Sequence, residues 1–174
     1  MAMDCHTHRV LLIVKPGFRR HIASILQMID TVFRGEWFEP QIDIPRPVQL
    51  SREQVQEIWG GARKAMGDQL WAEMAEYLLS GEVQPIILDA PYGPLLSPPR
   101  EEFPAAMRRL VGPTDPRRGG PDTLRGRFAE IPPASPTYYR NVLHAATEPE
   151  EVEANLKTLR LAREWRYQGE EDPD

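Results

Sequence analysis

The 174-residue sequence has very little cysteine and no long apolar runs. Cys5 is the only cysteine, so no disulfide can form within the chain, and we expect a reducing compartment, with the cytoplasm as the default location. The apolar run from Val10 to Val14 is short, and nothing approaches the roughly 20 apolar residues of a membrane span. The sequence therefore excludes a disulfide-stapled secreted domain and predicts no membrane contact.

The sequence also has no excess of basic residues. Its 21 Lys and Arg against 26 Asp and Glu give a net charge of -5, which argues against nucleic-acid binding but leaves room for a local basic pocket. We expect one compact domain over residues 9–166, between a loose N-terminus, 1–8, and a solvated acidic tail, 167–174.

A metal site is not predicted. Cys5, His6 and His8 are metal-ligand types, but a fourth ligand is missing and chain termini fray.

Proline, by contrast, is abundant: the chain has 18, most of them between positions 40 and 136. They predict long, stiffened connections between conventional elements. The segment Phe38 to Leu50 has near-alternating apolar residues but contains Pro40, Pro45 and Pro47. Because proline cannot donate to a strand ladder, we predict an edge strand or an extended loop there.

Three further segments predict strands. Val10 to Val14 has no polar face, as expected of a buried central strand. Val83 to Leu88 predicts another, although Pro85 inside it would require a bulge. Tyr138 to His144 predicts the last strand.

Helical periodicity predicts helices over residues 20–33 and 101–110, and from Glu148 toward Trp165. Ser51, with Gln54 three residues on, predicts the cap of a helix that runs to about Gly60, and Asp68 predicts the cap of another that is closed by Ser80-Gly81. Residues 112–131 are dense in glycine, proline and charge, which predicts a long loop, and such loops are usually functional. The order of elements predicts an α/β (α+β) sandwich of ferredoxin-like type with an antiparallel sheet of four strands.

His144 is the best candidate for a reactive centre, because it ends an apolar run that would fix its backbone and leave its ring free. Lys15 follows the first strand, and Arg108 and Arg125 flank the long loop. Each residue alone has a plainer interpretation: a structural histidine, a solvated lysine, surface arginines, and for Trp71 a place in the core. Only their joint occurrence favours a site.

Four segments together resemble the nucleoside diphosphate kinase family, in the family's order and over roughly residues 9–160. They are Val14-Lys15-Pro16-Gly17, Tyr77 to Gly81, Arg108 to Pro116 continuing to Thr123-Leu124-Arg125-Gly126, and Arg140-Asn141-Val142-Leu143-His144-Ala145. The resemblance implies a ferredoxin-like βαββαβ fold. It also implies transfer of the terminal phosphate from a nucleoside triphosphate to a diphosphate, in two half-steps through a phosphohistidine.

The resemblance assigns roles to seven residues. His144 would be the nucleophile, and Lys15, Arg108 and Arg125 would clamp the phosphates. The remaining roles fall to Thr114, which would contact phosphate, Asn141, which would hold the sugar hydroxyl, and Trp71, which would stack on the base. Mg²⁺ is implied as a partner of the phosphates, not as a protein-ligated ion.

The sequence departs from the family pattern near the histidine. The family has G-S-D after it, whereas this chain has Ala145-Ala146-Thr147. The glutamate that orients the imidazole aligns with Asn155, although Glu151 or Glu153 could substitute if the register shifts. These changes keep a second hypothesis open: a catalytically weak or inactive module of the same fold that binds nucleotide or a protein partner.

Two further departures lie farther from the histidine. Tyr139 stands where the family has a glycine near the base, and extra residues lengthen the loop 127–139. Family members assemble as hexamers or tetramers from dimers with paired edge strands. Pro40, Pro45 and Pro47 should weaken that pairing, so we predict a monomer or a non-standard dimer.

Overall fold

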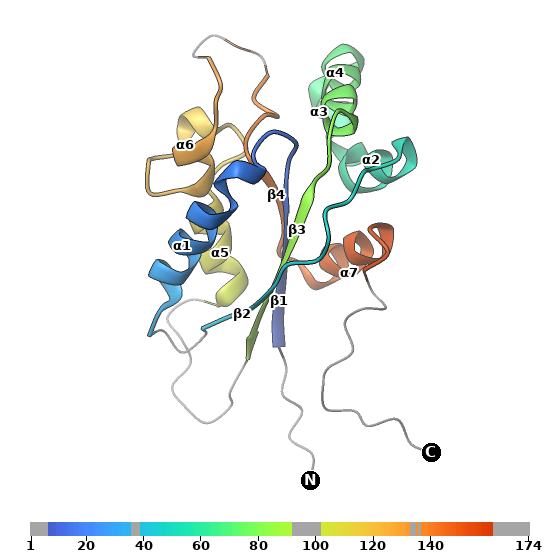
Figure 1. Ribbon diagram of the computed structural model, residues 1–174. Helices are drawn as coiled ribbons and strands as arrows, with labels where there is room; N and C mark the ends of the chain where they lie inside the picture. Colours follow the sequence, from blue (N-terminus) through green and yellow to red (C-terminus); the bar gives the residue numbers. More distant parts are fainter. Residues whose placement is uncertain (1–6, 36–38, 92–101, 133–134, 136, 162–174) are drawn as a thin grey trace, which may run out of the picture.

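The fold is an antiparallel sheet of four strands with helices on both faces (Figure 1). The computed structural model describes residues 7–35, 39–91, 102–132, 135 and 137–161. The strands are β1 (Thr7–Val14), β2 (Gln41–Asp43), β3 (Gln84–Pro91) and β4 (Leu143–Ala146), in the spatial order β2-β3-β1-β4. This arrangement confirms the predicted α/β sandwich, with β2 at an edge of the sheet.

The helices divide between the two faces of the sheet. One face carries α1 (Ile22–Phe33), α5 (Phe103–Val111) and α6 (Leu124–Phe128). The other carries α2 (Arg52–Trp59), α3 (Arg63–Met66), α4 (Asp68–Leu79) and α7 (Pro149–Thr158). Short 3-10 turns lie at η1 (Arg19–His21), η2 (Gly60–Ala62) and η3 (Pro116–Arg118).

The central strand β1 supplies both core layers. Successive side chains of a strand point to opposite faces, so Leu12 packs with the α1 and α5 layer, and Leu11 and Ile13 pack with the α2, α4 and α7 layer. All residues from Val10 to Val14 are fully buried, as predicted. Each such side chain stabilises the fold by roughly 1.5–3 kcal/mol.

Strand β3 accommodates Pro85 without the predicted bulge, so that prediction was wrong. Its pairing with β1 continues in one register through Pro85 to Gln84. On the other side, β2 stops at Asp43, and the next contact is an isolated bridge from Val48 to Val83. Pro85 therefore falls where no main-chain donor is needed, and the Gln84 side chain donates to the carbonyl of Pro45 instead (2.6 Å).

Several element boundaries differ from the predictions. Strand β1 begins at Thr7, inside the segment 1–8 predicted to be loose, and α1 begins at Ile22 behind a 3-10 turn. Asp68 is the first residue of α4, not its cap, and it pairs with Arg63 (Nε to Oδ1, 2.7 Å).

The short helices α3 and α6 were not predicted, and α6 lies within the segment expected to be a loop. Cys5, His6, Trp165, the acidic tail and positions 133, 134 and 136 of the loop 127–139 lie outside the described residues.

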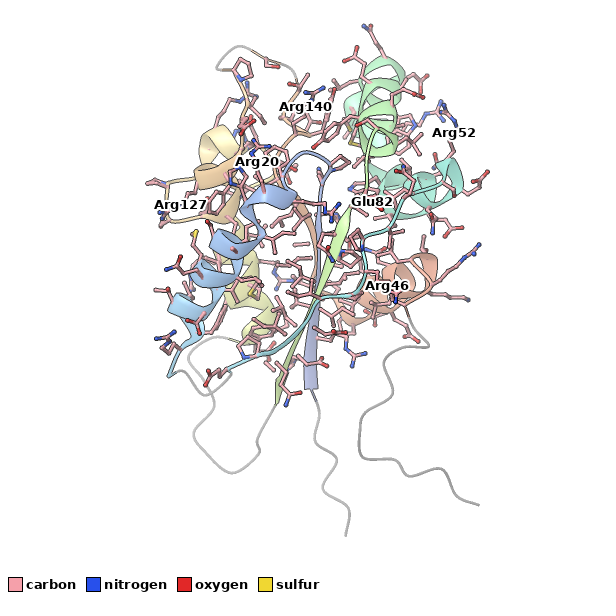
Figure 2. The ribbon with its side chains drawn as sticks, in the orientation of Figure 1. Arg20, Arg46, Arg52, Glu82, Arg127 and Arg140 are labelled. Atoms are coloured by element: carbon pink, nitrogen blue, oxygen red, sulfur yellow. The ribbon has the colours of Figure 1, made fainter. Side chains whose placement is uncertain are left out.

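Charged side chains lie at the surface, and Figure 2 shows Arg127 of α6 and Arg52 of α2 on the outer sides of the two helical layers. Arg52 pairs with Glu76, and Arg19 with Glu82, each at 2.8 Å. Exposed pairs of this kind contribute about 1 kcal/mol or less. The fold therefore depends on its two apolar layers. No helix in the described part of the chain is both long and apolar enough to span a bilayer.

Candidate active site

Lys15, at the end of β1, is a buried cation. Its Nζ donates to the carbonyl of Tyr139 and to Oδ1 of Asn141, both at 2.7 Å, and the residue is only 4% exposed. Burial disfavours the charged ammonium and the nearby Arg125 repels it, so the pKa of Lys15 falls to about 7.

A strained turn precedes β4. The N–H of Leu143 donates to the carbonyl of Asn141 (3.0 Å), which closes a γ-turn at Val142, whose φ is +80°. The left-handed region costs a β-branched residue roughly 1–3 kcal/mol. The surroundings hold the turn in place, because Val142 is fully buried and its carbonyl accepts from the main chain of Lys15 (2.8 Å).

The γ-turn corrects the predicted last strand, Tyr138 to His144. Strand β4 begins only at Leu143 and runs to Ala146. The turn brings Asn141 beside Lys15, and the strand pairs His144 with Ile13 of β1.

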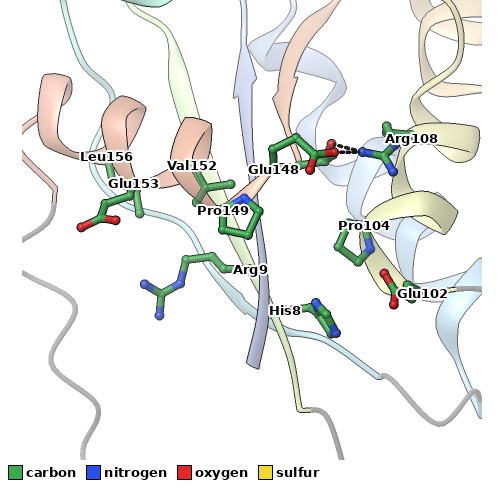
Figure 3. A pocket seen from close by; sticks show the side chains of 11 residues that line it. His8, Arg9, Glu102, Pro104, Arg108, Glu148, Pro149, Val152, Glu153 and Leu156 are labelled. Atoms are coloured by element: carbon green, nitrogen blue, oxygen red, sulfur yellow. Dashed lines mark hydrogen bonds and ion pairs between the residues drawn. The ribbon is translucent and has the colours of Figure 1, made fainter. Parts of the chain in front are cut away.

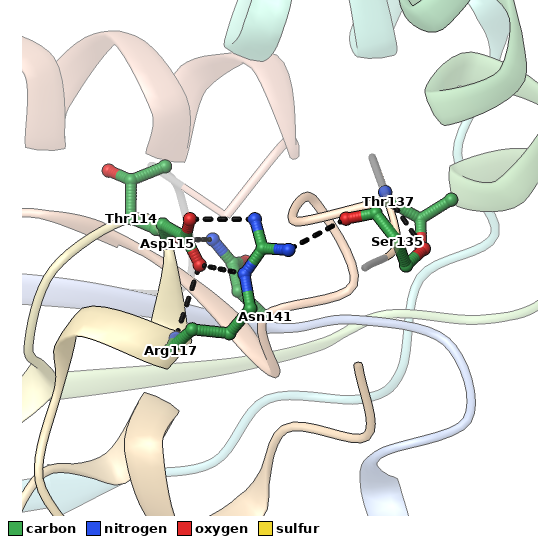
Figure 4. Close-up of polar contacts among 6 residues, drawn as sticks. All are labelled: Thr114, Asp115, Arg117, Ser135, Thr137 and Asn141. Carbon is green, nitrogen blue, oxygen red and sulfur yellow. Dashed lines mark hydrogen bonds and ion pairs between the residues drawn. The ribbon is translucent and has the colours of Figure 1, made fainter. Parts of the chain in front are cut away.

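The long loop between α5 and α6 is tied to this turn by polar contacts (Figure 4). Nδ2 of Asn141 donates to the carbonyl of Thr114 (2.6 Å). Beside it, Asp115 accepts from the guanidinium of Arg117, which also donates to the carbonyl of Ser135 (2.8 Å). The exposed Thr114 is thereby held next to Asn141.

Arg125, on α6, joins the same loop to β4. Its guanidinium donates to the carbonyls of Leu143 (3.1 Å) and Gly112 (3.0 Å). Burial lowers the pKa of Arg125 to about 10, which still leaves it charged at neutral pH.

His144 is held by α7 through one ring nitrogen. Nε2 lies 3.1 Å from Nδ2 of Asn155 and 3.5 Å from Oε1 of Glu151, and the ring packs against the ring of Trp59 with centroids 5.4 Å apart. Nδ1 is therefore the nitrogen left to face away from α7.

The pKa of His144 lies below its usual value. Burial is the largest cause, and Lys15 and Arg125 act in the same direction, whereas contact with the Glu151 carboxylate opposes them. The imidazole is therefore mainly neutral at neutral pH, which is the nucleophilic form.

A cavity of about 370 Å³ joins these residues. Five of the seven predicted site residues line it: Lys15, Thr114, Arg125, Asn141 and His144. The rest of the lining is largely apolar and aromatic, and it includes Ile58, Trp59, Met66, Met74 and Tyr138. Lys15, Arg125 and His144 thus line a cavity whose remaining wall is largely apolar. Such a cavity suits a ligand with an anionic group at one end and a flat ring at the other.

The structure does not bring Trp71 or Arg108 to this cavity. Trp71 is 8% exposed and packs in the core layer beneath α4. Arg108 donates to Thr147 (3.0 Å) and to Glu148, beside a separate cavity of about 450 Å³ that His8 also lines (Figure 3). Their contacts with a nucleotide stay predictions.

Two residues at the site had only weak signals in the sequence. Tyr138 was assigned to a strand, yet it lines the cavity. Glu151 was only an alternative to Asn155, yet both reach Nε2 of His144. Their spacing was the available signal, because residues four apart on a helix share a face.

A protein-held metal ion does not fit the described residues. No group of three or more His, Cys, Asp or Glu among them could hold one, and no described carboxylate lines the cavity. The charged side chains of the lining are the cations Lys15 and Arg125 instead.

Comparisons with known proteins agree on one family. The sequence model of the nucleoside diphosphate kinase family matches residues 8–162. A nucleoside diphosphate kinase of Staphylothermus marinus is 26% identical over 155 residues, which cover 88% of this chain and 93% of that protein. One of Ignicoccus hospitalis is 28% identical over 145 residues, which cover 83% and 82%.

Solved structures show the same fold. A nucleoside diphosphate kinase family protein from Babesia bovis superposes with a TM-score of 0.64 at 18% identity, over 92% of this chain and 95% of that one. The Aquifex aeolicus nucleoside diphosphate kinase gives a TM-score of 0.60 at 23% identity, over 88% and 94%.

Proposed function

The chain belongs to the nucleoside diphosphate kinase family, and we propose that it moves the terminal phosphate of a nucleoside triphosphate to a diphosphate through phospho-His144. One observation carries this proposal: His144, Lys15 and Arg125 line a single cavity, although they are far apart in the sequence. The alternative, an inactive module of the same fold, would have no need of a neutral imidazole beside two cations.

The reaction has two half-steps in one cavity. In the first, the lone pair of Nδ1 of His144 attacks the terminal phosphorus, and the bond from that phosphorus to the bridging oxygen breaks. The diphosphate leaves with the electron pair, and the phosphoryl group stays on the ring. In the second, a terminal oxygen of another diphosphate attacks the phosphorus and the P–N bond breaks, which restores the imidazole.

Lys15 and Arg125 supply the positive charge that this transfer needs. Both lie in a buried setting where an opposite charge acts strongly, so they favour the anionic oxygens during transfer. Mg²⁺ fits this site as part of the nucleotide substrate, where it neutralises phosphate charge, because the lining offers the metal no carboxylate.

Asn141 has a structural role in the site in addition to the proposed contact with the sugar. Its Oδ1 accepts from Lys15 and its Nδ2 donates to Thr114. It therefore positions both residues, and it can hold a sugar hydroxyl only by exchanging one of these partners. Trp71 could reach a base only if α4 moved, since its ring lies in the core.

We further propose that Arg108 reaches the phosphates only after leaving Glu148. The free energy needed to break that ion pair offsets part of the stabilisation that Arg108 gives to the phosphates. We therefore expect Arg108→Ala to lower kcat/KM by about tenfold or less, against roughly a hundredfold or more for Arg125→Ala. Arg109→Ala, the exposed neighbour on α5, is the matched control. Equal losses for Arg108 and Arg125 would overturn this ranking.

The function is tested by trapping the phosphorylated protein. Incubation with terminally labelled ATP and Mg²⁺ should give protein-bound label that is labile in acid and stable in alkali. His144→Ala should abolish the label, and His21→Ala, which alters a histidine on η1, should keep it. Label that survives His144→Ala would exclude this nucleophile. Nucleotide binding without any label would identify the inactive module.

We also propose that the protein acts on free nucleotides in the cytoplasm and not on nucleic acid. The support is compositional: a net charge of -5 and a single cysteine.

A further inference from the structure

The two contacts that α7 makes with His144 place opposite demands on its proton. A neutral imidazole carries hydrogen on one nitrogen and a lone pair on the other. Nδ2 of Asn155, 3.1 Å from Nε2, can only donate, so it needs the lone pair on Nε2. Oε1 of Glu151, 3.5 Å from the same atom, can only accept when ionised, so it needs the hydrogen there.

Only one of these arrangements leaves a nucleophile in the cavity. If the hydrogen sits on Nε2, then Nδ1 keeps its lone pair and can attack phosphorus. If Asn155 takes the lone pair of Nε2, the hydrogen sits on Nδ1 and blocks the attack. The choice between the two tautomers therefore decides whether His144 can react.

We propose that Glu151 is the positioning residue that keeps the proton of His144 on Nε2, so that Nδ1 is the nucleophile. This role rests on the proposed function only for its kinetic consequence, because the position of the proton can be measured without any reaction. Glu151 acts through His144 and does not itself need to touch the substrate.

Charge makes Glu151 the stronger of the two partners. An ionised acceptor forms a stronger hydrogen bond than a neutral amide does. Glu151 lies in the first turn of α7, where the helix dipole favours an anion, and its contact with His144 lowers its own pKa. The Glu151 carboxylate therefore stays ionised at neutral pH.

Asn155 is the adaptable partner. Turning its amide about the last side-chain bond exchanges Nδ2 for Oδ1 with almost no change of shape, and Oδ1 would then accept from the same Nε2–H. Asn155 is thus compatible with either tautomer and cannot select one. It is 5% exposed, so it still fixes the plane of the ring by packing.

The same carboxylate suits the phosphorylated state. When Nδ1 forms its bond to phosphorus, the ring becomes positively charged and keeps its hydrogen on Nε2, so no proton has to move. Lys15, which follows β1, and Arg125 from α6 disfavour a charged ring, and Trp59 from α2 carries no charge. In the described part of the chain, Glu151 alone favours it.

The test compares Glu151→Gln with Glu153→Gln, a matched loss of one carboxylate from the same helix. Glu153 lines the separate cavity beside Arg108 instead of the one at His144. In protein with ¹⁵N-labelled histidine, the ring nitrogen chemical shifts distinguish a protonated from an unprotonated nitrogen. We expect Nε2–H in the native protein and in Glu153→Gln. In Glu151→Gln, the Nδ1–H tautomer should increase and the pKa of His144 should fall.

Kinetics and rescue complete the test. Glu151→Gln should slow phosphoenzyme formation by about ten- to a hundredfold. Adding Asn155→Asp to that variant returns a carboxylate beside Nε2, and it should restore the tautomer and most of the rate. A purely structural role for Glu151 predicts neither the shift in pKa nor the rescue.

Two results would overturn the inference while leaving the proposed function intact: a phosphorylated Glu151→Gln variant with the native tautomer and rate, or a folded double variant without rescue. If the native protein takes no label from ATP but Glu151→Gln still moves the proton, the proposed function fails and the inference on the tautomer stands.

Discussion

At the scale of single residues, the cavity depends on a lysine that is only partly charged before substrate arrives. Lys15 is buried, its Nζ is held by two oxygens, and its pKa is about 7. Opposite charge nearby favours the protonated form. Phosphate in the cavity should therefore raise the pKa of Lys15. The side chain would then be protonated, and it would supply the positive charge that phosphoryl transfer requires.

This change predicts proton uptake on nucleotide binding. At pH 8, one unit above a pKa of about 7, roughly nine in ten Lys15 side chains are neutral, and binding should charge them. We expect an uptake close to one proton from this side chain. Calorimetry in buffers of different ionisation enthalpy measures it.

The control for proton uptake is Lys15→Arg, because a guanidinium stays protonated before and after binding. Any contribution from His144 is common to both proteins, so the difference isolates Lys15. Equal uptake by the two proteins would show that the proton goes elsewhere.

At the scale of elements, α2 links a capping motif to the wall of the cavity. Ser51 accepts from the N–H of Gln54 (3.2 Å), and the Gln54 side chain accepts from the N–H of Ser51 (2.9 Å), as the sequence predicted. The helix ends at Trp59, whose ring packs on His144. The cap stabilises that wall without touching a substrate.

Removing the cap should therefore lower the stability of the protein without changing its catalytic rate. We expect Ser51→Ala to lower the free energy of unfolding by about 1 kcal/mol and Ser51→Gly to lower it less. The melting temperature should fall by about 2–4 °C, with kcat unchanged. Thr31→Ala removes an exposed hydroxyl that donates to Gln27 within α1, and it should stay within about 0.5 kcal/mol of the native protein. Equal decreases in the free energy of unfolding for Ser51→Ala and Thr31→Ala would show that the cap has no special role in stability.

At the scale of the whole molecule, β2 forms a poor edge for association. It has three residues, Gln41–Asp43, with Pro40 before it and Pro45 after it. Ile42 and Ile44 are 40% and 45% exposed, so some apolar surface is available, but few main-chain donors are. Ladder pairing with a second copy should therefore be weak.

We accordingly expect multi-angle light scattering to give the mass of a monomer, or of a dimer that does not use β2. Ile42→Lys places a charge on this edge, and it should leave the measured mass unchanged. A hexamer, or a mass that Ile42→Lys reduces, would contradict this expectation.

The sequence by itself determined the features that depend on local pattern. Burial of Val10 to Val14, the edge character of β2 and the cap at Ser51 follow from apolar spacing and from which groups can form hydrogen bonds. The family motif also pointed to Lys15 and His144, which the structure brings to one cavity. Such signals are carried by neighbours in the chain.

Tertiary structure alone decided what depends on groups far away in the sequence. Pro85 fits without a bulge because β2 ends before reaching it, and Val142 adopts a left-handed conformation because Lys15 holds its carbonyl. Arg108 turns to Glu148 and not to the cavity, and Glu151 meets His144 because α7 packs against β1 beside it. In each case, contacts across the fold outweigh a local preference of a few kcal/mol or less.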